Sequence, residues 1–326
     1  MLLFYAGGPN QTFNIQRVPL SPSTLKRFGG KRQDFADEAR TRKITTDEES
    51  LGGFCPDVWS QNLLPAASAE RLGYPTQKPL ALLETVIAAS SNPGDLVLDP
   101  FCGCGTSIDA AHRLDRKWIG IDITHIAVGL IKHRLFHAFG IMENKDYRVV
   151  GEPEDIEGAR QLAHDEPYQF QSWALGKVGA RTANDVKRGA DQGIDGRLYF
   201  HDEGAAGKTK QIIFSVKAGK TGPDHVRDLS GVVGREKAEI GVLITMQEST
   251  KPMRSEAASG GFYESPHWGK FPRIQMLSIE DLLSGKGIQY PRESQRIDKT
   301  FKRAPKAEEP TGVAAQRLDL AENDDE

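Results

Sequence analysis

Two short stretches of the sequence combine residue types at a spacing that could support chemistry, and the first is a glycine-containing loop. It reads Asp99-Pro100-Phe101-Cys102-Gly103-Cys104-Gly105-Thr106 and joins an expected buried strand to an expected helix. Two glycines one residue apart let the backbone approach a ligand closely and turn sharply into the helix. Asp122 ends the next expected strand, about where such folds place a carboxylate on ribose hydroxyls. The pattern favours a nucleotide-containing ligand, and the alternative is a tight packing turn.

The second stretch pairs a carboxylate with a lysine on neighbouring strands. Residues 189–196 read Gly-Ala-Asp-Gln-Gly-Ile-Asp-Gly and open one strand, and the next strand ends Phe214-Ser215-Val216-Lys217. Two antiparallel strands can bring Asp195 and Lys217 to one end of a hairpin. Phosphodiester hydrolysis needs a carboxylate that holds a divalent ion, and a cation or base near the attacking water. Asp195 and Lys217 supply this minimal set of groups. The alternative is a purely structural hairpin, in which Asp195 caps the turn and Lys217 is solvated.

The elements that must position the loop follow from the apolar pattern of residues 76–140. The spacing predicts helices over 79–89, 106–114 and 124–139, and buried strands over 96–99 and 118–122. Helix and strand patterns that alternate in this way are typical of a doubly wound parallel sheet. Cys102 and Cys104 are interpreted as small packing residues, because their spacing is not that of a zinc site and no second pair completes four ligands.

A different pattern follows and predicts a second, mixed α/β unit. A helix is expected over about 158–178, then strands over 196–200 and 211–217. Further helices are expected near 224–238, 250–259 and 279–283, and further strands over 241–245 and 273–277. Residues 1–70 read as irregular, 141–158 as a linker, 159–287 as this second unit, and 288–326 as a disordered tail because of their many charges.

The composition bounds the class of protein. A length of 326 residues favours two domains, and 38% hydrophobic with 27% charged residues is typical of a globular chain. The sequence has no run of 18 apolar residues, so no membrane partner is expected. Three cysteines are too few for a disulfide framework and indicate a cytoplasmic protein. The net charge of −3 does not indicate nucleic acid, although a local groove can still be basic.

Asp99–Thr106 resembles the cofactor motif of the DNA amino-methyltransferases, the N-4 cytosine and N-6 adenine enzymes. Tyr74-Pro75-Thr76-Gln77-Lys78-Pro79-Leu80 resembles their second cofactor motif, and Asp57-Val58-Trp59 resembles a segment that precedes it. The order of these motifs is that of the beta group. The resemblance covers residues 1–140 and implies a Rossmann-like fold, S-adenosylmethionine as cofactor and double-stranded DNA as partner. It implies that five residues line the methionine side of the cofactor: Asp99, Phe101, Gly103, Gly105 and Thr106. It places Asp122 on the ribose, with Thr76, Gln77 and Lys78 closing over the cofactor.

The catalytic tetrapeptide of that family, Asp/Asn/Ser-Pro-Pro-aromatic, has no match in residues 1–70. The nearest string, Ser265-Pro266-His267-Trp268, lies in the other unit and is interpreted as a surface loop. We therefore expect residues 1–140 to begin within the methyltransferase domain, with 71–140 as its cofactor-binding half. The chain alone is expected to bind cofactor weakly and to transfer no methyl group, and a second chain would carry the missing catalytic half.

Residues 20–56 would then be a remnant of the target-recognition region. Basic side chains in this segment could contact DNA phosphates, which position DNA without reading its sequence. The alternative is a solvated charged loop. The basic residues are Lys26, Arg27, Lys31, Arg32, Arg40, Arg42 and Lys43.

The Gly-Ile-Asp-Gly and x-Val-Lys elements of the second unit resemble the Mrr-like restriction endonuclease domain of the PD-(D/E)xK superfamily. The resemblance implies Asp195 as ligand of Mg²⁺, Asp191 as a second carboxylate and Lys217 as the catalytic lysine. Ser215 departs from the pattern, because Glu or Gln normally stands two residues before the lysine. A helix carboxylate such as Glu166 could compensate, although Gln171 is an equally good candidate to face the site.

Three hypotheses for the whole chain stay open. It is a methyltransferase that needs its missing half, a nuclease with a binding platform, or a DNA-binding fragment without catalysis.

Overall fold

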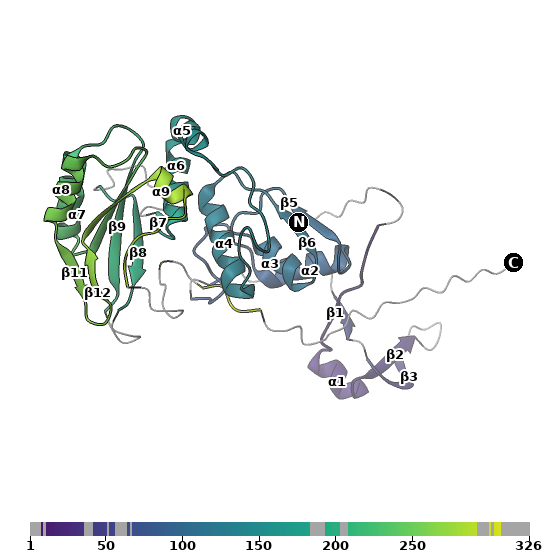
Figure 1. Ribbon diagram of the computed structural model, residues 1–326. Coiled ribbons are helices and arrows are strands. Elements are labelled where there is room, and N and C mark those ends of the chain that lie inside the picture. Colours follow the sequence, from purple (N-terminus) through teal and green to yellow (C-terminus); the bar gives the residue numbers. More distant parts are fainter. Residues whose placement is uncertain are drawn as a thin grey trace.

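The computed structural model describes residues 8, 11–35, 42–50, 52–55, 64–65, 67–182, 193–202, 208–291, 300 and 303–307. For residues 32–35 and 42–48 only the backbone is described. Figure 1 shows three groups of elements along the chain. A small N-terminal group precedes a first unit, made of α2–α4 with β5 and β6, and a second unit, made of α5–α9 with β7–β13.

The N-terminal group has regular structure where the sequence pattern predicts an irregular segment. Ser21 accepts a hydrogen bond from the N–H of Thr24 and caps α1, and Pro22 suits the first helical position because no N–H is needed there. β2 and β3 form an antiparallel hairpin, and β1 pairs with β4. β1 and β4 have two residues each, and β2 and β3 are mostly polar, so neither pair shows the apolar alternation by which a strand is predicted. The elements are β1 (Arg17–Val18), α1 (Pro22–Phe28), β2 (Lys31–Phe35), β3 (Arg42–Glu49) and β4 (Gly53–Phe54).

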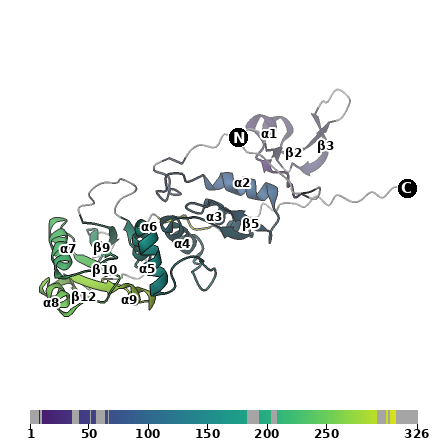
Figure 2. The same ribbon diagram turned by 90° about the horizontal axis from the view of Figure 1, so that it is seen from above.

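The first unit has the alternating order that the sequence predicts, which confirms that part of the expected α/β fold. β5 and β6 pair in parallel, with Leu98 opposite Ile119. α2 and α3 lie side by side and cover one face of these strands (Figures 1 and 2). The elements are α2 (Leu80–Ser90), β5 (Leu96–Asp99), α3 (Thr106–Arg113), β6 (Lys117–Gly120) and α4 (His125–Phe139).

The opposite face of β5 and β6 is apolar and uncovered by any described residue. Val97 and Trp118 point toward the helices and pack there. Parallel sheets are normally buried on both faces, so an apolar face open to solvent is unusual. The apolar side chains of that face are Leu96, Leu98, Ile119 and Ile121, which are 59%, 59%, 48% and 51% exposed, and Lys117 lies on the same face.

The second unit is built on a five-stranded mixed sheet in the order β13-β10-β9-β8-β7. β10 is parallel to both β9 and β13, while β8 is antiparallel to β9 and to β7. β11 and β12 form a separate antiparallel hairpin. The helices are α5 (Ile156–Asp165), α6 (Pro167–Lys177), α7 (Pro223–Arg235), α8 (Lys251–Ser259) and α9 (Ile279–Leu283). The strands are β7 (Arg181–Thr182), β8 (Gly196–Phe200), β9 (Lys210–Lys217), β10 (Ile240–Thr245), β11 (Phe262–Ser265), β12 (Gly269–Pro272) and β13 (Ile274–Ser278).

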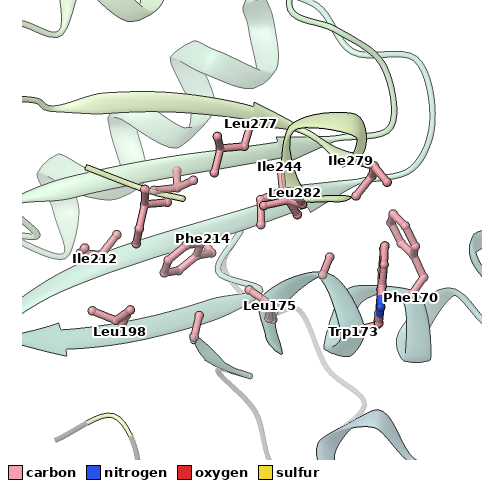
Figure 3. Packing of buried hydrophobic residues seen from close by; sticks show 14 of the residues in the cluster. Phe170, Trp173, Leu175, Leu198, Ile212, Phe214, Ile244, Leu277, Ile279 and Leu282 are labelled. Carbon is pink, nitrogen blue, oxygen red and sulfur yellow. The ribbon is translucent and has the colours of Figure 1, made fainter. Parts of the chain in front are cut away.

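Two hydrophobic cores lie on the two faces of this sheet. α5, α6 and α9 pack on one face, where Phe170, Trp173 and Leu175 meet Phe214 and Ile244 (Figure 3). α7 and α8 pack on the other face. All six residues of β10 are buried, which explains its continuous apolar pattern. The mixed α/β fold expected for this unit is thus confirmed.

The single helix expected over about 158–178 is two helices. α5 ends at Asp165 and α6 starts at Pro167, with Glu166 between them in a non-helical conformation. A proline lacks the N–H that a continuous helix needs and disfavours helical geometry in the residue before it. The prediction of one continuous helix was wrong because it followed the apolar spacing and did not take Pro167 into account.

Parts of the expected linker and of the expected disordered tail are packed. Within 141–158, Glu152 forms ion pairs with Lys132 and Lys177. Within 288–326, Thr300 accepts a hydrogen bond from the backbone of Tyr199 in β8, and residue 307 donates one to the carbonyl of Ala138 in α4. The described tail residues therefore touch both units, which charge content alone does not reveal. In the part of the chain that the structure describes, no helix has the length and apolar character needed to cross a bilayer.

Candidate functional site

The glycine loop leaves β5 and enters α3 with a left-handed backbone at both glycines. The φ angle is +51° at Gly103 and +74° at Gly105, a region that other residues rarely adopt. Space is tight as well, because a Cβ on Gly105 would lie 2.7 Å from the Ile131 side chain and one on Gly103 would lie 3.0 Å from Tyr74. Both glycines are therefore required by conformation and by packing, which partly supports the packing-turn alternative.

Asp99 and Asp122 brace this loop through short hydrogen bonds. Asp99 accepts from the N–H of Phe101 at 3.1 Å and from the Ser107 hydroxyl at 2.5 Å. Asp122 accepts from the N–H of Gly103 at 3.0 Å, and from the N–H and hydroxyl of Thr124 at 2.9 and 2.7 Å. A carboxylate offers about four lone-pair positions. Asp122 therefore keeps acceptor capacity for a ligand hydroxyl beside the loop.

The remaining loop residues differ in accessibility. Phe101 is 88% exposed, so its ring is free to cover a ligand. Thr106 is buried at the start of α3, where no side chain caps the helix. Uncapped N–H groups in a first helical turn suit an anionic group such as a carboxylate. These features fit the methionine part of S-adenosylmethionine.

The second expected cofactor motif lies next to the loop but mainly holds its own backbone. Gln77 accepts from the N–H of Leu72 at 2.8 Å and donates to the carbonyl of Glu70 at 2.7 Å. Lys78 donates to the carbonyl of Thr76 at 3.2 Å and is otherwise accessible. Gln77 therefore stabilises the turn before α2, while the Thr76 and Lys78 side chains stay available to a ligand.

A buried ion pair below the loop was not expected from sequence. Arg134 of α4 and Asp109 of α3 are each 1% exposed and lie 2.8 Å apart. Arg134 also donates to the carbonyl of Cys104 at 2.9 Å, and Arg113 pairs with Asp109 at 2.6 Å. The only signal in the sequence is an arginine within the apolar pattern of the 124–139 helix. The pair fixes the loop to both helices.

Cys102 and Cys104 are buried packing residues, as expected. Cys102 packs with Ile108, Ile131 and Leu135. The described residues contain no group of three His, Cys, Asp or Glu side chains that could hold a metal ion.

Asp195 and Lys217 meet at one end of the β8–β9 hairpin. The Nζ atom of Lys217 lies 3.8 Å from Oδ2 of Asp195, which also accepts from the N–H of Val216 at 2.7 Å. Asp195 is buried, whereas the Lys217 side chain is 39% exposed. Ser215 is buried next to them in β9, opposite Leu243 of β10.

The other residues considered for this second site divide into three cases. Gln171 of α6 donates to the carbonyl of Asp195 at 3.5 Å, so it lies beside the pair. Glu166 lies at the break between α5 and α6. Asp191 lies outside the described residues. The described site thus holds one carboxylate and one lysine, which is the lower end of the one or two carboxylates by which Mg²⁺ is usually bound.

The other residues singled out in the sequence are the 265–268 string, the basic residues of 20–56 and residues 57–59. Ser265 ends β11, and the three residues after it form the hairpin turn, in agreement with a surface loop. Lys26 and Arg27 lie in the last turn of α1, and Lys31 starts β2. The side chains of Arg32, Arg40, Arg42 and Lys43, and residues 57–59, lie outside the described part.

Comparison with known families finds two separate matches. Residues 1–133 match the family N6_N4_Mtase, described as DNA methylase. Residues 167–278 match a family described as NACHT-associated inactive Restriction Endonuclease 1.

Individual relatives match the first part of the chain. Type II methyltransferase M.EcaI of Enterobacter cloacae is 40% identical over 109 residues, which are 33% of this chain and 23% of that protein. Type II methyltransferase M.HpaI of Haemophilus parainfluenzae is 41% identical over 100 residues, 31% of this chain and 32% of that protein. A solved complex of M1.HpyAVI with SAM is 40% identical over 21% of this chain and 35% of that chain, with a TM-score of 0.18. The chain thus spans about a quarter to a third of these relatives.

The chain is thus similar to a DNA methylase family in its first part and to a restriction endonuclease-like family in its second part. The expected resemblance of the first part to the N-6 and N-4 DNA methylases is confirmed.

Proposed function

We propose that this chain is the cofactor-binding part of a DNA methyltransferase that a second polypeptide completes. The assembled enzyme transfers a methyl group from S-adenosylmethionine to an exocyclic amino group of adenine or cytosine in double-stranded DNA, in the cytoplasm. The methylase match of residues 1–133 and the matched Type II methyltransferases support this class of reaction.

The uncovered face of the β5–β6 sheet is the observation that carries the proposal. Its aliphatic side chains are about half exposed, although they belong to the strands that hold the cofactor loop. A second polypeptide with further strands and helices would bury this face, as parallel sheets require. The matched relatives are much longer than their shared segment, so they contain chain that could form such a layer.

The chain's own contribution is to bind and orient the cofactor. S-adenosylmethionine, when bound, supplies an electrophilic methyl group. Asp122 would accept from a ribose hydroxyl, and the left-handed loop at Gly103 and Gly105 would let backbone groups contact the methionine part. Phe101, Lys78 and Thr76 would cover the ligand. Asp99 and the buried Thr106 would keep the loop in shape.

Methyl transfer measured with and without the second polypeptide tests the proposal. The DNA upstream of the Met1 codon would be read for a frame that encodes a Pro-Pro tetrapeptide, and its product would be co-expressed with this chain. We expect labelled methyl incorporation into duplex DNA by the pair and none by the 326-residue chain alone. Methylation by this chain alone would contradict the need for a second polypeptide, and the absence of such a frame would contradict the methyltransferase proposal.

Matched substitutions test whether the exposed sheet face is the contact. Leu98→Glu should abolish co-purification and methyl transfer without lowering the melting temperature of the isolated chain, because this side chain is already 59% exposed. Met142→Glu, at a similarly exposed apolar residue away from the sheet, should leave association unchanged. Equal effects of both substitutions would show that the sheet face is not the contact.

A second function, DNA binding by the restriction endonuclease-like unit, is favoured by the Asp195–Lys217 pair. Ser215 is a short neutral residue at the position where the pattern normally has Glu or Gln, so we propose binding without cleavage. The matched family is likewise described as inactive. Supercoiled plasmid with Mg²⁺ should stay intact, whereas Lys217→Ala should weaken binding of a duplex oligonucleotide in a gel-shift assay. Plasmid nicking that Lys217→Ala abolishes would contradict this view and assign Mg²⁺-dependent cleavage.

A further inference from the structure

A pocket of about 470 Å³ lies between α4 of the first unit and α6 of the second. The loop over 72–76 and the residues at 180–182 complete its walls. The pocket adjoins the expected cofactor site: Tyr74, Pro75 and Thr76 of the second cofactor motif line it, whereas the glycine loop and Asp122 do not. Its volume falls within the range of small-molecule sites, which is roughly 300–1,000 Å³.

Polar contacts hold the two helices at both ends of this pocket. At one end, Gln169 of α6 accepts from the N–H of His125 at 3.0 Å and donates to the carbonyl of Ile123 at 3.2 Å. At the other end, Glu152 bridges Lys132 of α4 and Lys177 of α6 at 2.6 and 3.0 Å. These contacts therefore fix the distance between α4 and α6, so the space between the two helices is a defined feature of the fold.

Two glycines within the helices leave this space open. Gly129 of α4 and Gly176 of α6 both line the pocket, and a Cβ on either would meet no atom within 4 Å. Glycine within a helix costs about 1 kcal/mol relative to alanine. Neither glycine is needed for a left-handed backbone or for close packing, so their contribution is the empty volume between the helices.

A buried hydrogen-bond donor at the pocket has no partner. The indole Nε1 of Trp173 makes no hydrogen bond in the described structure, although the residue is only 2% exposed. Trp173 lines the pocket, and its nitrogen lies at the end of the ring away from Ile279 (Figure 3). An unpaired buried N–H costs roughly 1–3 kcal/mol, and an acceptor on a ligand would remove that cost.

The ionisable residues along the pocket leave a small excess of positive charge. Lys132, Lys177 and Arg181 line it with Glu143 and Glu152, and both lysines are paired with these carboxylates. Two histidines also line it. Burial lowers the pKa of His125, so its ring adds no charge at neutral pH. The Nζ atom of Lys177 lies 5.8 Å from the centre of the Trp173 ring, which places a cation beside the free donor.

We propose that this pocket binds a mononucleotide. Its planar base would lie in the slot between Gly129 and Gly176 and accept from Trp173. Its phosphate would be attracted by the excess positive charge of the pocket lining. The proposal does not rest on methyl transfer, because it uses neither the glycine loop nor the uncovered sheet face.

Calorimetric titration of the full chain with adenosine 5′-monophosphate and cytidine 5′-monophosphate tests the proposal. We expect saturable binding of at least one of them, and weaker binding of the nucleoside without its phosphate. Trp173→Phe keeps the ring and removes the donor, so it should weaken binding about tenfold, the effect of one hydrogen bond. Gly129→Leu should fill the slot and abolish binding while favouring the helix.

Two control variants make the outcome decisive. Gly231→Leu on α7 also replaces a glycine with open space around it, but lies away from the pocket, and should leave binding unchanged. Asp122→Ala should also leave it unchanged, because Asp122 belongs to the cofactor loop. The proposal is overturned if neither mononucleotide binds, if Gly129→Leu binds as well as Gly231→Leu, or if Asp122→Ala alone abolishes binding.

Discussion

At the scale of single residues, the cofactor loop is held by groups that lie beneath it. Arg134 links Asp109 to the carbonyl of Cys104 and has almost no exposure to solvent. A buried charge that loses its partner is far more costly than an exposed one, because water cannot replace the lost interaction. The loop geometry therefore depends on a residue that never touches the cofactor.

Replacing Arg134 by alanine should strongly destabilise the protein. We expect a loss of about 3–5 kcal/mol in the free energy of unfolding, measured by urea denaturation, because Asp109 would keep only Arg113. Arg160→Ala removes a comparable but exposed pair with Glu157 and should cost less than about 1 kcal/mol. Similar losses for both variants would show that the Arg134 pair is not effectively buried.

The partly exposed and buried thiols should react at different rates. Burial raises the pKa of Cys102 to about 11, so at pH 8 only about one thiol in a thousand would be ionised. Cys55 is partly exposed. Iodoacetamide at pH 8 followed by mass spectrometry should therefore modify Cys55 and leave Cys102 intact. Rapid modification of Cys102 in the folded chain would contradict its position in the core.

The sequence was most informative about residues whose role is local. The turn glycines could be predicted because their neighbours along the chain define the strand–loop–helix geometry. Asp122 was expected to end a strand, but β6 ends at Gly120 and Asp122 accepts from the N–H of Gly103, 19 residues away in sequence. The roles of Gln77 and Arg134 could not, because each is set by a partner brought close only by folding. The Trp173 donor was missed for the same reason: the apolar spacing of its helix indicated only a core residue.

At the scale of elements, patterns that repeat over a whole helix or strand predicted the order of both units. The expected strands at 96–99, 196–200 and 241–245 agree with β5, β8 and β10 to within one residue. The failures have local causes. Pro167 divides one periodic segment into two helices, and β11 and β12 are four-residue strands with too little pattern to detect.

The contact between α4 and α6 should weaken in acid. Burial tends to raise the pKa of Glu152, but hydrogen bonds from Lys132 and Lys177 outweigh it, so the folded pKa lies below the ordinary value. A lowered folded pKa stabilises the protein above the unfolded pKa near 4.5, and this stability is lost as the pH falls through the folded value.

Glu152→Gln is the variant that measures this effect. It should lower the melting temperature at pH 7 and bring it closer to that of the unmodified chain as the pH falls below about 4. Differential scanning calorimetry from pH 3 to 7 gives the comparison. A constant difference between the two proteins across this range would exclude Glu152 as the titrating group.

At the scale of the whole molecule, the two units are joined by more than the connector between α4 and α5. Residue 300 bonds to β8, and residues 303–307 pack along the first unit, where Ala304 meets Leu72 and Ala138. Arg113 adds a hydrogen bond to the carbonyl of Pro305 at 3.2 Å. This returning segment could not be predicted, because its composition is polar and its contacts are distant in sequence.

Removal of the returning segment should weaken the coupling between the units. A chain that stops after residue 291 should unfold in two thermal transitions or at a lower temperature than the full chain. A chain that stops after residue 307 keeps the contacts and should behave like the full chain. Equal melting temperatures for the two shortened chains would contradict the predicted role of residues 300–307.

The returning segment also determines which residues must be exchanged together when a chimaera with another protein is made. A chimaera made by exchanging residues 159–287 would keep a C-terminal segment whose anchor on β8 had been replaced. A functional exchange would therefore need to move residues 159–300 together and preserve the surface of α4 that receives residues 303–307. The second unit and the returning segment, although separate in sequence, would therefore have to be exchanged together.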